Sequence, residues 1–443
     1  MSILEQSIFK PILIAICLIT LLLLGSYFIF LDNIKLLLLL AMLGIFFVLL
    51  ANYAEIILVY SIVGVLLVIY TQYTSFDIAA PYGLVIAFLS IYFVSRNFDN
   101  ILNSVNPLLL MLAFFILFLI FLNTIKAPDI SDSTKTGLRT SLPIIMSFLF
   151  SFLYMNKIDV KLFIRVLYLS LIYFLLLPGD IAFLLKWGQW DKFNSFYYGN
   201  APHTFSHFLS ILTLFSLHYS VKNKIAYIVL ANSFILLFAT TIRTSIITAA
   251  VFCCTYAICS KNKKTLLITL ILFSFILVLP SSRSILTAKF SEFFQTAPAD
   301  YTDEIGSGRV GIWKRNIRFF ANQSILEQLL GSGMHSQHFE YRRGTLRTTI
   351  DTHNDYLALL LQIGLFGLII YCILLLFCII KAWLKSAELE KRNENMGVYP
   401  LLFAFAFGVL ISNVFSNSYV NRFQIAIFFW PLMGYLFSNV KKN

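Results

Sequence analysis

Long apolar runs separated by short polar breaks occupy most of this chain. A spanning helix needs about 20 mostly apolar residues, because only a helix satisfies its own backbone hydrogen bonds in lipid. The pattern predicts an all-α polytopic membrane protein, with residues 1–443 as one membrane domain of about 12 to 14 transmembrane helices. The apolar runs lie near Pro11–Phe30, Ile34–Leu50, Ile56–Tyr73, Ile78–Val94, Val105–Leu122, Ser141–Tyr154, Leu162–Leu177, Thr204–Tyr219, Ile225–Thr241, Ser245–Cys259, Leu266–Leu279, Leu357–Ile380, Val398–Phe415 and Phe423–Phe437.

The basic residues of the short loops predict the orientation, since cytoplasmic loops carry an excess of Lys and Arg. Alternation through the predicted spans places every basic cluster on one face, and both termini with them. The clusters are Lys157 and Lys161; Lys222 and Lys224; Lys261, Lys263 and Lys264; Lys381, Lys385, Lys391 and Arg392; and Lys441 and Lys442. Both termini are therefore expected to be cytoplasmic. The opposite face carries a smaller loop, 178–203, and a large loop, 282–354.

The large outer loop is the one segment long enough for a small extramembrane subdomain. Its residues Val310, Trp313, Ile317 and Phe320 recur at helical spacing, with Ser307 as a candidate cap. This helix is expected either to lie at the membrane interface or to pack on its own loop.

The composition agrees with a membrane protein and changes the meaning of its net charge. The chain is 59% hydrophobic and 12% charged, with a mean hydropathy of +0.84. This excludes a soluble enzyme, a disordered protein and a nucleic-acid binder, so the net charge of +12 serves topology instead. All six cysteines lie in apolar runs, which predicts packing residues without a disulfide framework or a zinc site.

Three polar positions at the outer face could carry chemistry. Arg243, between two apolar runs, is either a snorkelling anchor or an anion-binding group. Arg309 follows glycines at the start of the predicted outer helix, and is either a solvated loop residue or an anion ligand. His353, where the large loop re-enters the membrane, is either a structural residue or a base for a hydroxyl group. Asp351 or Asp355 could orient this histidine.

Other familiar chemistry has little support in the sequence. His203 and His207 share a helical face, but two histidines make no metal site without a third ligand, and Asp191 is an unsupported third. There is no outer Asp-x-Asp pair, P-loop or dinucleotide-binding glycine pattern. This argues against a Mg²⁺-dependent sugar-nucleotide enzyme and an ATP-driven transporter.

Several of these residues together resemble the O-antigen ligase and O-antigen polymerase superfamily. Ten residues separate His353 from Gly364, which matches the ligase pattern, and Arg243 resembles an essential arginine of the family. That arginine is often followed four residues later by Leu, where this chain has Ile247. The remaining matching segments are Ser307-Gly308-Arg309, Ile312-Trp313, Gly331-Ser332-Gly333, His353-Asn354-x-Tyr-Leu and the glycines Gly364 and Gly367.

The resemblance implies a bacterial inner-membrane glycosyltransferase of the GT-C type, with its active site facing the periplasm. Its donor would be an undecaprenyl-diphosphate-linked glycan, transferred with inversion and without a metal or other cofactor. Arg243 and Arg309 would hold the donor diphosphate, and His353 would be the general base. Asp351, Asn354 and Asp355 are candidates for supporting His353.

The resemblance leaves the acceptor open. A ligase transfers the glycan to the lipid A-core, and a polymerase transfers it to another lipid-linked repeat unit; the spacing from His353 to Gly364 favours the ligase. Protein O-oligosaccharyltransfer is a further alternative. A flippase or transporter is disfavoured, because the basic residues gather at the outer mouth and not along a path within the spans.

Overall fold

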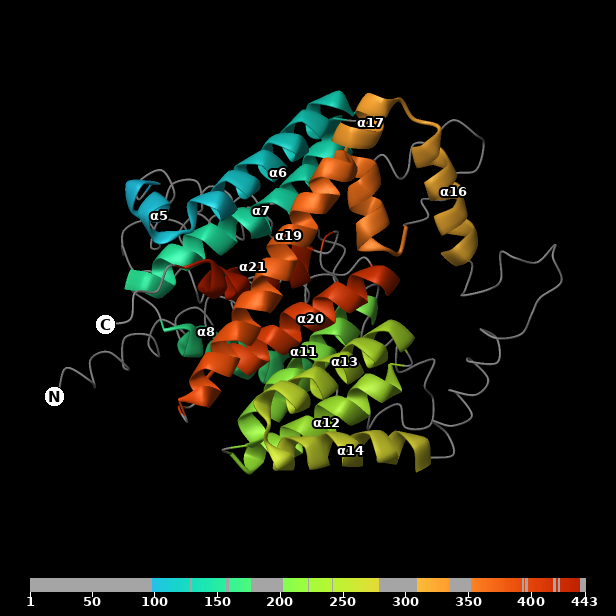
Figure 1. Ribbon diagram of the computed structural model, residues 1–443. Coiled ribbons are helices and arrows are strands. Elements are labelled where there is room, and N and C mark those ends of the chain that lie inside the picture. Colours follow the sequence, from blue (N-terminus) through green and yellow to red (C-terminus); the bar gives the residue numbers. More distant parts are fainter. Residues whose placement is uncertain are drawn as a thin grey trace, which may run out of the picture.

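The described part of the chain forms a bundle of helices (Figure 1). This computed structural model describes residues 98–127, 130–156, 159–176, 202–221, 223–240, 242–278, 309–334, 352–392, 394, 397–416, 420 and 423–438. The helices are α5 (Phe98–Ser104), α6 (Pro107–Lys126), α7 (Ile130–Asn156), α8 (Val160–Leu171), the π-helical η1 (Ile172–Leu176), α11 (Pro202–Ser220), α12 (Ile225–Ala239), α13 (Arg243–Ser260), α14 (Lys263–Val278), α16 (Arg309–Ala321), α17 (Ile325–Leu330), α19 (Asp355–Lys391), α20 (Tyr399–Phe415) and α21 (Phe423–Phe437).

The all-α membrane architecture is confirmed within these residues. Each span predicted after residue 98 coincides with a helix, and α8 with η1 together form the one predicted at Leu162–Leu177. In the described part, α6, α7, α13 and α19 are long and apolar enough to cross a membrane, and α12, α20 and α21 are shorter apolar helices. The four spans predicted before residue 98 lie outside the described residues, so the total number of spans stays a prediction.

Large apolar side chains on the outside of the bundle indicate which surfaces face lipid. On α6 they recur every three or four residues, which makes one continuous face; Leu108, Met111, Phe115, Phe118, Leu122 and Ile125 are all exposed. A soluble protein rarely exposes so continuous an apolar surface. The opposite face of α6 is buried through Leu109, Ile116 and Leu119.

Small residues let the central helices approach closely, which is how helices associate in lipid. At Gly434, an added Cβ atom would meet the backbone of Ser147, so α21 lies directly against α7. At Gly408, it would meet the ring of Phe252, so α20 lies directly against α13. Helix α11 packs on both α12 and α13, and α19 packs on α20 and α6.

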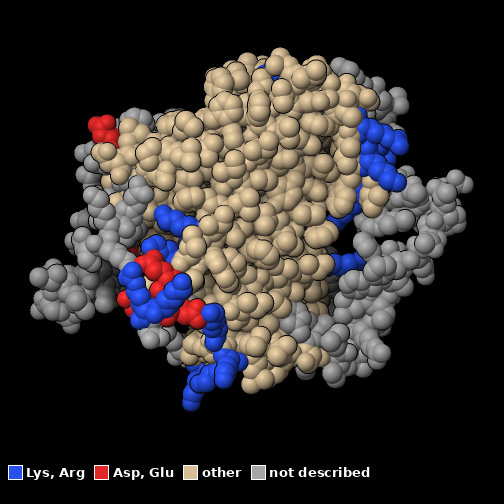
Figure 2. Space-filling view, in the orientation of Figure 1, with Lys and Arg blue, Asp and Glu red and all other residues tan. Residues whose placement is uncertain are grey.

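Contacts between helix ends separate the loops into two sets. At one end, Lys261 forms an ion pair with Glu390, and the ring of Tyr154 contacts that of Tyr435. The short loops with the described basic residues lie at this end, where Figure 2 shows blue side chains gathered beside red ones. At the other end lie the first residues of α11, α13 and α19.

A break in α19 is held by the segment that follows α17. Gly364 has φ +71°, and its backbone lies so close to Leu329 that no Cβ atom fits. The break frees the carbonyl of Leu361, which accepts hydrogen bonds from both the backbone N–H (3.1 Å) and the hydroxyl (2.9 Å) of Ser332. The Gly331-Ser332-Gly333 motif therefore holds the kink of α19 in place, and we call this segment the clasp.

Candidate active site

The residues of the candidate site contact the last carbonyl groups of α20. Asn354 Nδ2 donates to the carbonyl of Val414 (3.0 Å), and Arg309 Nη1 donates to that of Phe415 (2.8 Å). The backbone N–H of Asp355 donates to the carbonyl of Ser416 (3.2 Å). A helix leaves its last carbonyls without intrahelical partners and favours a cation there. Three successive carbonyls thus bring the N-terminus of α16 beside the residues that flank His353.

His353 occupies a turn that is held on both sides. Its φ of +50° is in the left-handed region, which is uncommon for a residue with a side chain and is typical of turns and functional sites. Before it, the carbonyl of Thr352 accepts a hydrogen bond from Trp313 Nε1 of α16 (3.0 Å). After it, Asn354 caps α19 by accepting from the backbone N–H of Leu357 (3.0 Å).

Arg243 is the first residue of α13 and lies at the same end of the bundle as the His353 turn. Ser245, in the same turn, hydrogen-bonds to Ser206 of α11 (2.6 Å), and Thr248 donates to Ser412 of α20 (2.9 Å). Because α13 and α20 run in opposite directions, the start of α13 lies level with the end of α20. Sequence positions 243 and 309 are thereby brought together.

The two arginines are close enough to affect each other. Arg309 is half-buried, and burial lowers the pKa of its guanidinium; the positive charge of Arg243 lowers this pKa further. Two cations held close together repel, and an anion between them would relieve this repulsion. Guanidinium groups match phosphate oxygens in a two-pronged geometry, so the pair is suited to a phosphate or diphosphate.

Asp355 enters a buried hydrogen-bond network behind the turn. Its fully buried carboxylate accepts from the backbone N–H of Val420 (3.3 Å). With the amide of Asn413 oriented to satisfy its neighbours, Asn413 Nδ2 donates to Asp355 Oδ2 (3.0 Å) and its oxygen accepts from the Tyr371 hydroxyl (2.8 Å). These contacts connect the first turn of α19 to α20 and to the segment before α21.

The structure therefore assembles Arg243, Arg309, His353, Asn354 and Asp355 at one end of the bundle. Asp351 lies outside the described residues, as does Ser307. The helix predicted around Val310 exists as α16, but its buried positions are Gly311 and Asn316, and Ile317 is exposed.

Several residues of the site were not anticipated from the sequence. Asn413 and Ser416 take part through contacts between segments far apart in the chain, for which a single sequence carries no signal. Trp313 was noted only as a helix position and as part of a family segment, and its hydrogen bond to Thr352 was not foreseen. His207, which the sequence did not favour as a metal ligand, is buried with its Nε2 3.3 Å from the Ser416 hydroxyl. In the described residues, no group of three or more His, Cys, Asp or Glu is placed to hold a metal ion.

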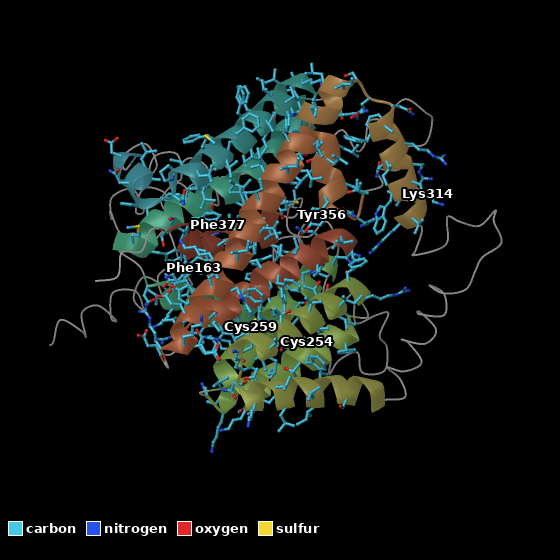
Figure 3. The ribbon with its side chains drawn as sticks, in the orientation of Figure 1. Phe163, Cys254, Cys259, Lys314, Tyr356 and Phe377 are labelled. Carbon is cyan, nitrogen blue, oxygen red and sulfur yellow. The ribbon has the colours of Figure 1, made fainter. Side chains whose placement is uncertain are left out.

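The arrangement places two arginines and a histidine-bearing turn at one end of a helical bundle. Figure 3 shows Tyr356, in the first turn of α19, on the inner side of α16, whereas Lys314 lies on the outer side. A group transfer with an anionic leaving group needs these parts, because fixed cations stabilise charge that develops on the leaving group. A neutral histidine nearby can accept a proton from an attacking hydroxyl.

Comparison with known proteins relates part of the chain to a family. Residues 228–372 match the family model described as O-antigen ligase. The matched stretch contains Arg243, Arg309, His353 and Gly364, and it confirms the resemblance inferred from those residues. Nothing matches among the curated proteins.

Proposed function

We propose, from the premise that residues 228–372 belong to the O-antigen ligase and polymerase superfamily, that this protein is an O-antigen ligase. The enzyme would transfer a glycan from undecaprenyl diphosphate to a sugar of the lipid A-core during lipopolysaccharide biosynthesis. The observation that carries the proposal is the convergence of Arg243, Arg309 and the His353 turn on the end of α20.

In the proposed reaction, Arg243 and Arg309 bind the donor diphosphate. The acceptor hydroxyl attacks the anomeric carbon on the face opposite the diphosphate. A new bond forms between this carbon and the acceptor oxygen, and the bond between the carbon and the diphosphate oxygen breaks, so the anomeric configuration inverts. The acceptor proton passes to His353, and the electron pair of the broken bond leaves on the diphosphate, where the two arginines stabilise it.

Asn354 and Asp355 support the base in this proposal through the backbone. Asn354 caps the helix that begins beside His353, and Asp355 anchors the same turn to α20. Reacting groups must be held in a narrow range of distances and angles, and such anchors supply that order. Asp351 remains a proposed partner from the sequence alone.

The alternative function is polymerisation, in which the acceptor is a second lipid-linked repeat unit. The same arginines and base would serve it, since the donor is the same. The spacing of ten residues between His353 and Gly364 favours the ligase.

The proposed location is the bacterial inner membrane, with the site facing the periplasm and both termini in the cytoplasm. The basic loops at the opposite end support this orientation, since such loops stay cytoplasmic. The lipid tail of the donor would then lie in the bilayer, and its sugars outside it.

The first test is His353→Ala, which we expect to reduce transfer by about 10²- to 10⁴-fold, the usual contribution of a general base. Surface lipopolysaccharide separated on a gel measures it. The control is His218→Ala, because His218 lies at the other end of α11 beside Tyr256. Full-length O-chains in the His353 variant would exclude the base assignment.

The same gel separates the two functions. Loss of a ligase leaves long polymer on undecaprenyl diphosphate and bare core on the surface. Loss of a polymerase leaves core that carries a single repeat unit, which would contradict the ligase proposal.

A further inference from the structure

Two helices outside the spans expose large apolar side chains. In α17, Ile325 and Leu326 are 77% and 64% exposed, and in α16, Ile317 is 52% exposed. These residues do not belong to the candidate site, whose contacts come from the other side of α16. Apolar side chains so exposed, on helices this short, indicate a surface that water alone does not cover.

The depth of α17 relative to the bilayer follows from its attachment to α6. Lys126, the last residue of the apolar helix α6, donates to the carbonyl of Gly331 (3.0 Å) and lies 3.6 Å from the carboxylate of Glu327. One turn earlier, Asn123 Nδ2 donates to the carbonyl of Leu330 (2.6 Å). Because the apolar face of α6 ends here, α17 lies at the boundary between hydrocarbon and headgroups.

The outer face of α16 is cationic. Its inward face carries Arg309, Trp313 and Asn316, which belong to the candidate site or are buried. Its outward face carries Lys314, Arg315 and Arg318, all exposed, and the helix contains no acidic residue. Figure 2 shows blue side chains gathered at the place that α16 occupies in Figure 1.

We propose that the outward faces of α16 and α17 form a contact surface for the anionic phospholipid headgroups of the adjacent leaflet. Leu326 and Ile325 enter the interface, and the cationic side chains of α16 bind lipid phosphates. Apolar residues beside Lys and Arg on a helix at the bilayer boundary are typical of interfacial helices, and each basic residue near an anionic surface adds to the attraction. The contact would hold α16, and with it Arg309, at the level where a lipid diphosphate emerges.

The first experiment measures the depth of α17. The protein, with its native cysteines replaced by alanine, is reconstituted in nanodiscs and spin-labelled at Leu326→Cys. We expect oxygen to reach this label more readily than a water-soluble nickel complex does. A label at Phe118→Cys, on the lipid-facing side of α6, is the reference and should behave in the same way. Nickel accessibility equal to that of a free nitroxide in water would overturn the proposal.

The second experiment measures lipid selectivity with spin-labelled phosphatidylglycerol and phosphatidylcholine. We expect a several-fold preference for phosphatidylglycerol in the unmodified protein. The triple variant Lys314→Glu, Arg315→Glu and Arg318→Glu should lower this preference, and the charge-retaining control Lys314→Arg, Arg315→Lys and Arg318→Lys should keep it. An unchanged preference in the charge-reversed variant would overturn the proposal, and would leave a phosphorylated glycan as the occupant of this face. Neither readout requires glycan transfer, so the result does not depend on the proposed activity.

Discussion

At the scale of single residues, the position of His353 is set by hydrogen bonds of its neighbours. Trp313 holds the carbonyl before it, and Asn354 holds both the first turn of α19 and the end of α20. The left-handed backbone at His353 costs energy, which these contacts offset. A change in a neighbour should therefore affect the reaction without touching the imidazole.

Arg309→Lys tests whether a positive charge alone is sufficient to bind the donor diphosphate. An ammonium group keeps the charge but loses the two-pronged grip on a diphosphate, so we expect turnover to fall by about 10²-fold. Steady-state transfer by purified protein measures this. The control is Arg318→Lys on the outward face of the same helix, which should leave turnover unchanged. Near-normal turnover of the Arg309 variant would remove Arg309 from the diphosphate site.

Asn354→Ala tests the supporting turn. Loss of a helix cap costs about 1 kcal/mol, and a displaced base should lower transfer by about 10- to 100-fold. The matched control is Ser324→Ala, which removes the cap of α17, where Ser324 accepts from the backbone N–H of Glu327 (3.3 Å). Thermal unfolding should show similar losses for the two variants, with transfer reduced only for Asn354. Equal transfer in both would contradict the positioning role.

The residues of the site differ in how far a sequence can predict them. Arg243 and His353 were singled out because a cation or histidine at the edge of an apolar run is costly and conspicuous, and Arg309 because it follows glycines at the start of a predicted helix. The buried network of Asp355, Asn413 and the Tyr371 hydroxyl was not predicted, because it depends on how α19 and α20 pack.

At the scale of elements, the kink in α19 connects the site to the large outer loop. The half-helix after His353 ends at Gly364, where the segment around Ser332 closes the break. The same segment is fixed to α7, because the Ser133 hydroxyl donates to the carbonyl of Met334 (2.9 Å). The clasp thus holds the short half-helix against the rest of the bundle.

Gly364→Ala should break this arrangement. A Cβ atom at this position would meet the backbone of Leu329, and the kink requires a positive φ that alanine rarely adopts. We therefore expect the free energy of unfolding to fall by about 1–3 kcal/mol, with a marked loss of transfer. The control is Gly367→Ala, where the three nearest atoms to an added Cβ all belong to the side chain of Ile363 in the same helix and none to the backbone. Thermal unfolding and transfer assays compare the variants. A Gly364 variant as stable and active as the Gly367 variant would show that the kink is dispensable.

The elements themselves were largely predicted from the sequence. Apolar runs determine where helices cross lipid, and each run within the described residues became a helix. The kink and its clasp were not predicted, since glycines in an apolar run also indicate close packing. The capping box that starts α17, between Ser324 and Glu327, was also missed, although its spacing is visible in the sequence.

At the scale of the whole molecule, the two ends of the bundle carry different kinds of residues. The short basic loops lie at one end, where Lys261 pairs with Glu390 and Arg392 pairs with Glu388, and the starts of α13, α16 and α19 lie at the other. The sequence predicted this division from the alternation of loops, and the family resemblance implied that Arg243 and Arg309 act on one diphosphate. It could not show that they meet through the starts of α13 and α16 at the end of α20, because that depends on how the helices pack. That convergence is the central claim of the proposed mechanism.

A double-mutant cycle on donor binding tests this claim most directly. The dissociation constant of undecaprenyl diphosphate is measured in nanodiscs for the unmodified protein, Arg243→Ala, Arg309→Ala and the double variant. If both arginines hold one diphosphate, the effects should be non-additive by about 1 kcal/mol or more. Effects that add within about 0.5 kcal/mol, or a single variant that binds normally, would contradict a shared diphosphate site.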